Sequence, residues 1–232
     1  MLGTSEHLDD AVSRLRVGRV NAAARPLGLA DDTRSKVELG RGAVLVVDDD
    51  WPEWKRRHMT HLARVIWKTH ISPDAVAVLE SAALVWGVPV LHEGETVHLS
   101  RAASRNRHRL QLQESDELSR VKPPSVVRHG FALEPDEWVE LAGIRVSSLD
   151  RLALDFARLR QPRVSLPVID AVLRRLSSGD RRDRTGTLER AAEIRERWVA
   201  TAANMRGTRG IRRARALLPH ADPLSEAIGE SA

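Results

Sequence analysis

The sequence contains no cysteine and no tyrosine, and aromatic residues make up only 3% of the chain. The lack of cysteine excludes a disulfide framework and any thiolate metal site. So few aromatic side chains cannot build the stacking platforms that read single-stranded nucleic acid. No apolar run approaches the roughly 20 residues of a membrane span, and the polar N-terminus does not have the pattern of a signal peptide. The sequence predicts a cytoplasmic protein with no membrane partner, built as one large domain or two small ones.

Lysine is scarce as well. The 232 residues include 37 lysines and arginines, of which only four are lysines, and the net charge is +5. An arginine guanidinium offers a planar fork for phosphates and carboxylates, which a lysine ammonium does not. A genome rich in G and C explains this ratio equally well, because its codons favour arginine, but it does not explain where the arginines lie.

The arginines gather in the middle and the last third of the chain. Residues 174–215 contain 13 arginines and five acids, and residues 101–128 contain seven basic and three acidic residues. A basic stripe on a helix indicates contact with a phosphate backbone. The alternative is a solvated helix face with ion pairs, and the sequence leaves both open.

Hydrophobic periodicity and turn residues predict an α+β fold. We expect helices at 6–17 and 52–69, a buried helix at 75–86 that Gly87 ends, and helices at 148–158, 167–176, 185–204 and 208–218. A hairpin is expected at 37–47, and short strands at 95–146 should form a small, mostly antiparallel sheet. We divide the chain into a winged-helix-like part (1–50), an α/β body with C-terminal helices (51–218) and a tail (219–232).

The candidate nucleic-acid contacts follow from the basic residues in these elements. The hairpin has an arginine at its tip, the helix at 52–69 has a basic face, and the last helix follows a Gly-Thr-Arg-Gly loop. The predicted contacts are Arg41, Lys55, Arg56, Arg57, Arg64, Arg209, Arg212 and Arg213.

No constellation indicates catalysis, a metal or a cofactor. His58 and His61 have a spacing that some metal sites use, but their basic neighbours oppose a cation, and surface histidines are the simpler interpretation. Asp155 and Asp170 are candidates for paired catalytic carboxylates. Each has an arginine one helical turn away, so the ion pairs Arg151–Asp155 and Asp170–Arg174 favour structural roles.

Other polar and aromatic residues have structural interpretations too. Ser147 and Ser148 are expected to cap the helix that follows them, and the run of three aspartates at 48–50 to cap and solubilise the helix after Trp51. Among the tryptophans, we expect burial in the core or partial exposure that favours a protein partner. The expected core set is Trp54, Trp67 and Trp86, and the expected partly exposed pair is Trp138 and Trp198.

Residues 37–218 carry motifs in an order that resembles a large actinobacterial family of two related kinds. One kind is the AbiE-type (type IV) abortive-infection antitoxins. The other joins the same front part to a nuclease similar to very-short-patch-repair endonucleases. The matching residues are Gly42, Ser81, Ala82, Ala83, Gly87, Pro89, Val97, His98, Leu99, Gly143, Ser147, Ser148, Arg151, Leu152, Asp155, Val168, Asp170, Ala171, Leu173, Arg174, Gly210, Arg212, Arg213 and Arg215.

The resemblance implies a non-enzymatic transcriptional regulator that binds DNA and a partner protein, such as a nucleotidyltransferase-like toxin. It also implies a three-helix unit before the hairpin, but Pro26 and Gly28 interrupt the segment where the recognition helix would run. The tail at 219–232 resembles the beginning of the nuclease domain without its metal-binding Asp and Glu-x-Lys elements. Two alternatives therefore remain: the accessory region of a truncated endonuclease-family protein, and a protein-interaction module that does not bind DNA.

Overall fold

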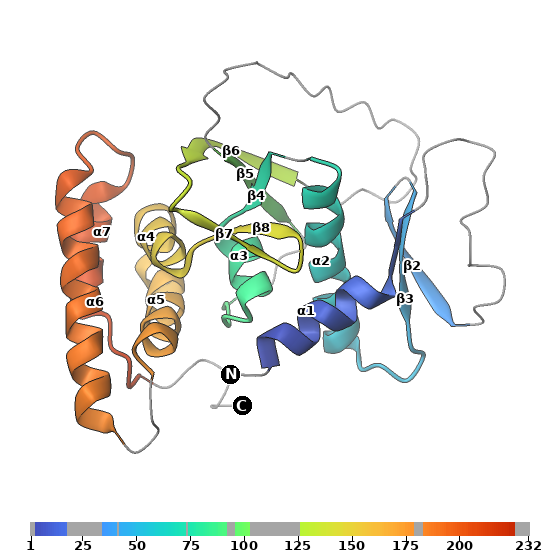
Figure 1. Ribbon diagram of the computed structural model, residues 1–232, viewed down its shortest axis with the longest axis horizontal. Helices are drawn as coiled ribbons and strands as arrows, with labels where there is room; N and C mark the ends of the chain where they lie inside the picture. The colour runs from blue at the N-terminus through green and yellow to red at the C-terminus, as the bar shows by residue number, and fades with distance from the viewer. Residues whose placement is uncertain are drawn as a thin grey trace. The chain divides into compact units, whose positions relative to one another are not determined.

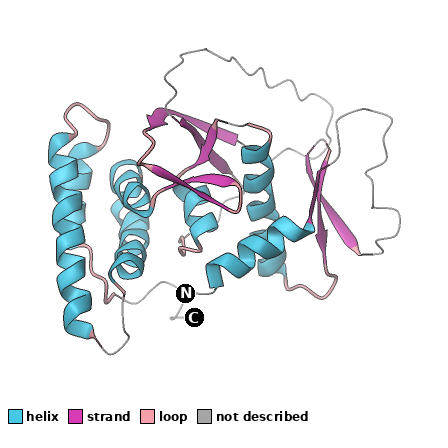
Figure 2. Ribbon diagram, viewed as in Figure 1, coloured by secondary structure: helices cyan, strands magenta, loops and turns pink. Residues whose placement is uncertain are grey.

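The structure is a computed structural model that describes residues 3–17, 34–40, 42–72, 74–91, 96–102, 126–178 and 183–225 (Figure 1). Helices and two small sheets give the mixed α+β architecture that the sequence predicts (Figure 2). The chain divides into two compact units: residues 1–77, 94–135 and 140–145 form the first, and residues 78–93, 136–139 and 146–232 form the second.

In chain order the elements are α1 (Gly3–Arg14), β1 (Leu15–Val17), β2 (Ser35–Gly40), β3 (Ala43–Val47), α2 (Glu53–His70), β4 (Ala75–Ala77), α3 (Leu79–Trp86), β5 (Val97–Ala102), β6 (Val126–Leu133), β7 (Trp138–Leu141), β8 (Ile144–Ser147), α4 (Leu149–Leu159), α5 (Pro162–Ser177), α6 (Arg184–Asn204), α7 (Ile211–Leu217) and the 3₁₀ helix η1 (Leu218–His220).

The first unit begins with a helix and a three-stranded antiparallel sheet in the order β1-β3-β2. The predicted hairpin is β2–β3, and Gly42 with φ of 81° supplies the left-handed residue that its tight turn requires. The helix predicted at 6–17 ends three residues early, because residues 15–17 pair with β3. Arg41 and residues 18–33 lie outside the described residues, so the winged-helix-like unit stays a prediction.

Helix α2 lies against both sheets of the first unit. Its buried side, which includes Met59, Leu62 and Ile66, covers strands β2 and β3 of the small sheet and β4 and β5 of the larger one. Burial of this apolar stripe stabilises the helix more than its capping does, since Pro52 at the N-cap makes no side-chain hydrogen bond. Only the side of α2 that these elements do not cover can face solvent.

The expectation of one buried helix over residues 75–86 is wrong for its first half. Residues 75–77 form strand β4, which pairs antiparallel with residues 99–101 of β5, and only Leu79–Trp86 is helical. The apolar run Ala-Val-Ala suits a strand buried on both faces, and the hydrogen bonds of the ladder satisfy its backbone. The end of the element matches the prediction, because Gly87 is a left-handed C-cap with φ of 64°.

The larger sheet has the strand order β6-β5-β4-β8-β7, and every strand contributes residues to the first unit. Of its described pairings, β4 and β5 run antiparallel and β5 and β6 run parallel, so the predicted mostly antiparallel sheet contains at least one parallel pair. Their register shifts between Leu99 and Arg101, where β6 has extra residues. Residues 110–113, another predicted strand, lie outside the described residues.

The second unit is mainly helical (Figure 2). Helix α4 packs on α5, α5 packs on α6, and α7 packs on both α4 and α6. Ser148 caps α4 as predicted, since its hydroxyl accepts a hydrogen bond from the amide of Arg151. Helix α5 begins at Pro162 rather than at the predicted residue 167, because a proline in the first turn costs no hydrogen bond.

Candidate nucleic-acid interface

One side of α2 carries a stripe of cations. Arg57, Arg64 and Lys68 are spaced by seven and four residues, which places them on one side of a helix. Arg57 is exposed, whereas Arg64 and Lys68 are half-buried and Nε of Arg64 is buried. The stripe is about 16 Å long at 1.5 Å per residue. Arg57 pairs with Glu53 at 2.8 Å, but both side chains are mostly exposed, so the pair contributes little to folding and exchanges easily for a phosphate.

The other predicted residues of α2 point elsewhere. Lys55 lies over the buried ring of Trp51, with its ammonium 4.6 Å from the ring centroid. Arg56 is half-buried, and its Nε is buried with no hydrogen-bond partner in the described part of the chain. Of the four predicted contacts on this helix, Arg57 and Arg64 share the stripe, and Lys68 is an additional member that the sequence interpretation missed.

The hairpin turn lies at the C-terminal half of α2. A Cβ on Gly40 would stand 2.2 Å from the Trp67 ring, so only glycine allows this close approach. The ammonium of Lys68 lies 4.4 Å from the centroid of the same ring. Gly40 and Lys68 therefore lie against the same buried ring, although they are far apart in the sequence.

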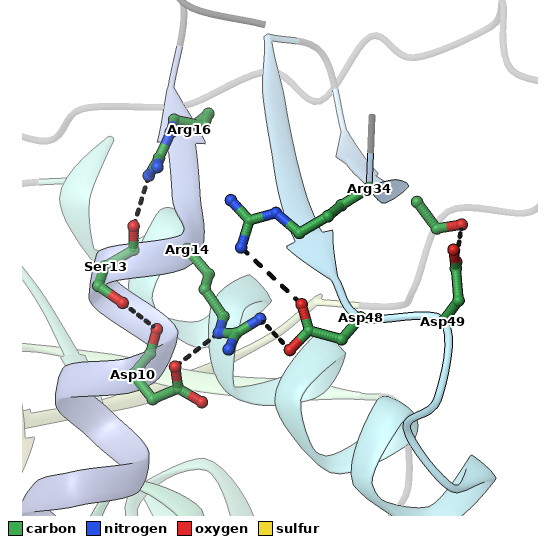
Figure 3. A network of polar contacts seen from close by, with 8 residues as sticks. Asp10, Ser13, Arg14, Arg16, Arg34, Asp48 and Asp49 are labelled. Carbon is green, nitrogen blue, oxygen red and sulfur yellow. Dashed lines mark hydrogen bonds and ion pairs between the residues drawn. The ribbon is translucent and has the colours of Figure 1, made fainter. Parts of the chain in front are cut away.

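A polar network lies at the other end of the hairpin, where β3 leads into α2 (Figure 3). Arg14 at the end of α1 donates from Nη1 to Asp48 at 2.8 Å and from Nε to Asp10 at 2.6 Å. Burial alone lowers the pKa of Arg14, but the two carboxylates more than offset that effect and raise it. The predicted aspartate run therefore binds cations of its own unit, with Arg34 Nη1 3.8 Å from Asp48.

The histidines and tryptophans of the first unit differ in part from the predictions. His61 is buried rather than on the surface, with Nε2 3.2 Å from the carbonyl of Thr96. His58 lies beside the ring of His7, 5.7 Å between centroids. Trp54, expected in the core, is 66% exposed. Trp54 lies on the side of α2 that faces solvent. The prediction was wrong because helical periodicity does not show how wide the buried side of a helix is.

In the second unit, seven of the described arginines bind main-chain carbonyls. Arg213 donates to the carbonyl of Arg160, and Arg215 donates to the last carbonyls of α6 at Ala202 and Ala203. The backbone carbonyl of Arg209 accepts a hydrogen bond from Arg158. The side chains of Arg209 and Arg212 are exposed. The same pattern recurs in the pairs Arg174–Pro223, Arg175–Trp86, Arg190–Ser177 and Arg195–Ala221.

Asp155 is the centre of a buried ion network. Its two oxygens lie 2.9 Å from Arg151 Nε and 3.2 Å from Arg158 Nη1, and Arg151 also reaches Glu137 at 2.5 Å. Burial raises the pKa of Asp155, and the two guanidiniums oppose that effect. The pKa of Arg158 is lowered by burial, whereas the carboxylates around Arg151 offset its burial and raise its pKa. The network joins α4 to the turn at Glu137, and both oxygens of Asp155 are occupied by guanidiniums.

Asp170 and Arg174 form no ion pair with each other, contrary to the spacing argument. Asp170 accepts hydrogen bonds from the amide of Asp222 at 2.8 Å and the hydroxyl of Ser225 at 2.7 Å, and burial raises its pKa. Arg174 donates to the carbonyl of Pro223 at 3.0 Å. Both side chains therefore hold residues 222–225 against α5, a contact over about 50 residues that local spacing cannot reveal.

Two of the three tryptophans of the second unit also differ from their predicted environments. Trp198, expected to be partly exposed, is buried, with Nε1 donating to Asp150 at 2.6 Å. Trp86, expected in the core, is half-buried, and its Nε1 donates to the carbonyl of Ser147 at 2.8 Å. Trp138 is half-buried as predicted.

The chain matches none of the protein families, curated proteins or solved structures with which it was compared. Within the described ranges, no three histidines, aspartates or glutamates come together as a metal-binding group. No helix in that part of the chain has the length and apolar character to cross a membrane. The interpretation of function therefore depends on the geometry above.

Proposed function

We propose that this protein is an antitoxin-like transcriptional regulator, without enzymatic activity, that binds duplex DNA through α2 and the β2–β3 hairpin. The observation that carries the proposal is that Arg57, Arg64 and Lys68 share one side of α2, with Lys68 over the ring of Trp67 against which Gly40 of the hairpin lies. A basic helix beside a hairpin offers a phosphate-binding surface like that of a winged helix, with the hairpin as the wing. The predicted three-helix unit before the hairpin belongs to this proposal as well.

The interactions of the C-terminal arginines also decide which of them can belong to the interface. Phosphate contacts need guanidiniums whose N–H groups reach solvent, and Arg213 and Arg215 direct theirs to helix-end carbonyls. Among the predicted contacts, we therefore place Arg57 and Arg64 at the interface. Arg213 lies outside it, and the exposed Arg209 and Arg212 remain candidate contacts.

Binding of duplex DNA by variants with matched charge changes tests the proposal. We would measure affinity for DNA from upstream of the protein's own gene by fluorescence anisotropy, at salt concentrations between about 50 and 200 mM. Arg57→Gln with Arg64→Gln should weaken binding and reduce the slope of log K against log salt by about 2, since each lost phosphate contact accounts for about 0.9. Arg213→Gln with Arg215→Gln removes the same charge and should leave the slope unchanged, because both side chains bind helix-end carbonyls.

Two results would contradict this function. The first is no binding by the wild-type chain at the lowest salt concentration. The second is an equal loss of slope in both double variants, because that would mean that net charge rather than the α2 face determines binding.

A second candidate, a protein-interaction module, is favoured by one residue. Trp54 is 66% exposed on α2, and exposed tryptophans next to arginines are typical of binding hot spots. In the antitoxin interpretation this residue would contact the toxin, for which a nucleotidyltransferase-like protein is the proposed partner. Trp54→Ala should abolish capture of a purified partner encoded beside this gene. Loss of DNA binding instead would assign Trp54 to the DNA interface.

A further inference from the structure

Asp48 receives two guanidiniums at the open end of the hairpin. Arg14 Nη1 lies 2.8 Å from Oδ2, and Arg34 Nη1 lies 3.8 Å from Oδ1 (Figure 3). The three side chains come from the end of α1, the residue before β2 and the residue after β3. Two guanidiniums that converge on the oxygens of one anion form the arrangement by which proteins also bind phosphate.

Arg14 is held in place by contacts that do not involve Asp48. Its Nε donates to Asp10 at 2.6 Å, and its guanidinium carbon lies 4.7 Å from the centroid of the Trp51 ring. Trp51 is buried and has Lys55 over it as well, so the ring is a fixed support. Movement of Asp48 would leave the guanidinium of Arg14 in the same position, ready for another anion.

Asp48 itself is held weakly. Side-chain exposure is 32% for Asp48, 20% for Arg14 and 45% for Arg34. Partly exposed ion pairs contribute little to folding, because water screens them and competes for the same groups. A purely structural carboxylate would be expected in a drier site, as Asp155 is. An anion with more charge and more acceptor oxygens therefore has an advantage over the carboxylate of Asp48.

We infer that Arg14 and Arg34 form a phosphate subsite that Asp48 occupies as an internal competitor, and that one phosphate of the nucleic-acid backbone displaces it. The inference rests on the proposed function, because bound DNA supplies the phosphate. Asp48 thereby weakens DNA binding by the protein, and its removal strengthens it. A role in folding alone predicts the opposite sign, since loss of a structural contact would weaken binding.

Neutral variants of two neighbouring aspartates separate local competition from general charge. Asp48→Asn and Asp50→Asn change the net charge equally, and Asp50 has an exposed side chain. In the DNA anisotropy assay, Asp48→Asn should bind about threefold or more tightly at about 50 mM salt, with the wild-type slope, because it removes the competitor and leaves the number of phosphate contacts unchanged. Asp50→Asn should give a smaller gain and the wild-type slope. Equal gains in the two variants would overturn the inference.

The arginine can be tested in a second variant that leaves the core untouched. Arg34→Gln in the wild-type background should reduce the salt slope by about 0.9, because its phosphate contact is lost. Arg34→Gln added to Asp48→Asn should remove the gain in affinity. Persistence of the full gain in this double variant would show that Arg34 is not part of the subsite.

Inorganic phosphate tests the subsite without DNA. At constant ionic strength, with chloride as the reference, phosphate should raise the Tm of Asp48→Asn more than that of Asp50→Asn or the wild type. If the wild-type chain binds no duplex but this Tm shift occurs, the proposed function fails and the phosphate subsite stands. If DNA binds but neither the Tm shift nor the affinity gain of Asp48→Asn occurs, the subsite fails and the proposed function stands.

Discussion

The arginines of the two units have different interaction partners, although their local sequences do not distinguish them. In the second unit Arg190, Arg213 and Arg215 donate to carbonyls at or near the ends of helices α5, α4 and α6. In the first unit Arg57 is exposed on α2, and the half-buried Arg64 lies on the same side of that helix. The denser arginine cluster is therefore the structural one, and the sparser group is the candidate interface.

Helix ends explain this difference. The last four carbonyls of a helix have no partner within it and carry partial negative charge, so a guanidinium nearby both satisfies and neutralises them. The second unit packs several helices whose ends lie close to one another, and each end attracts an arginine. Helix α2 packs on α1 and on strands, whose carbonyls are already paired, and of its arginines only Arg57 is exposed.

The largest loss of stability from a single substitution is expected at Asp155. Asp155→Ala leaves Arg151 and Arg158 buried without their shared carboxylate, and we expect a loss of about 3–5 kcal/mol in the free energy of unfolding. Urea unfolding followed by circular dichroism measures it. Asp136→Ala, at an exposed turn, is the matched control and should change stability by less than about 0.5 kcal/mol. A loss at Asp155 no larger than that of the control would mean that the network contributes nothing to folding.

A smaller loss is expected at the loop between α6 and α7. A Cβ on Gly210 would stand 2.1 Å from the carbonyl oxygen of Arg158, and the residue has φ of 77°. Gly207 has φ of 72° and open space around it. Gly207→Ala should therefore cost only the left-handed backbone penalty of about 1–2 kcal/mol, and Gly210→Ala distinctly more. Equal shifts in Tm for the two variants would show that the loop moves away without cost.

The smallest changes in stability are expected for one arginine from each unit, Arg215 and Arg64. Arg215→Gln removes the donor to the end of α6 and should lower the free energy of unfolding by about 0.3–1 kcal/mol, with DNA affinity unchanged. Arg64→Gln should do the reverse, weakening DNA binding with little change in stability. Thermal unfolding and anisotropy on the same two samples provide both readouts. Exchange of the two outcomes would reverse the roles assigned to the units.

Local signals in the sequence predict some elements well and others poorly. The Ser148 cap, the left-handed Gly87 and the glycine turn of the hairpin are visible because each depends on a few neighbouring residues. Strand β4 was mistaken for helix because its partner is residues 99–101, about 25 residues further along the chain. The partner of Asp170 was missed for the same reason, since it lies at residues 222–225.

Some features of the candidate interface can likewise be predicted from the sequence, and others cannot. The basic composition of α2 can be read directly, and so can its helical period. Which of Lys55, Arg56, Arg57 and Arg64 face outward depends on how many elements cover the helix, and two sheets leave only a narrow side exposed. The subsite around Asp48 has no local signal, because Arg14 and Asp48 are separated by 34 residues.

By itself the sequence determined the α+β composition, most helix and strand positions, and the excess of arginine over lysine, because periodicity, caps and composition are local properties. Only the tertiary structure decided which arginine meets a carbonyl, which meets a carboxylate and which meets water. That choice depends on distances between segments far apart in the chain. A guanidinium binds any of these partners, so its role is set by the one that folding brings within reach.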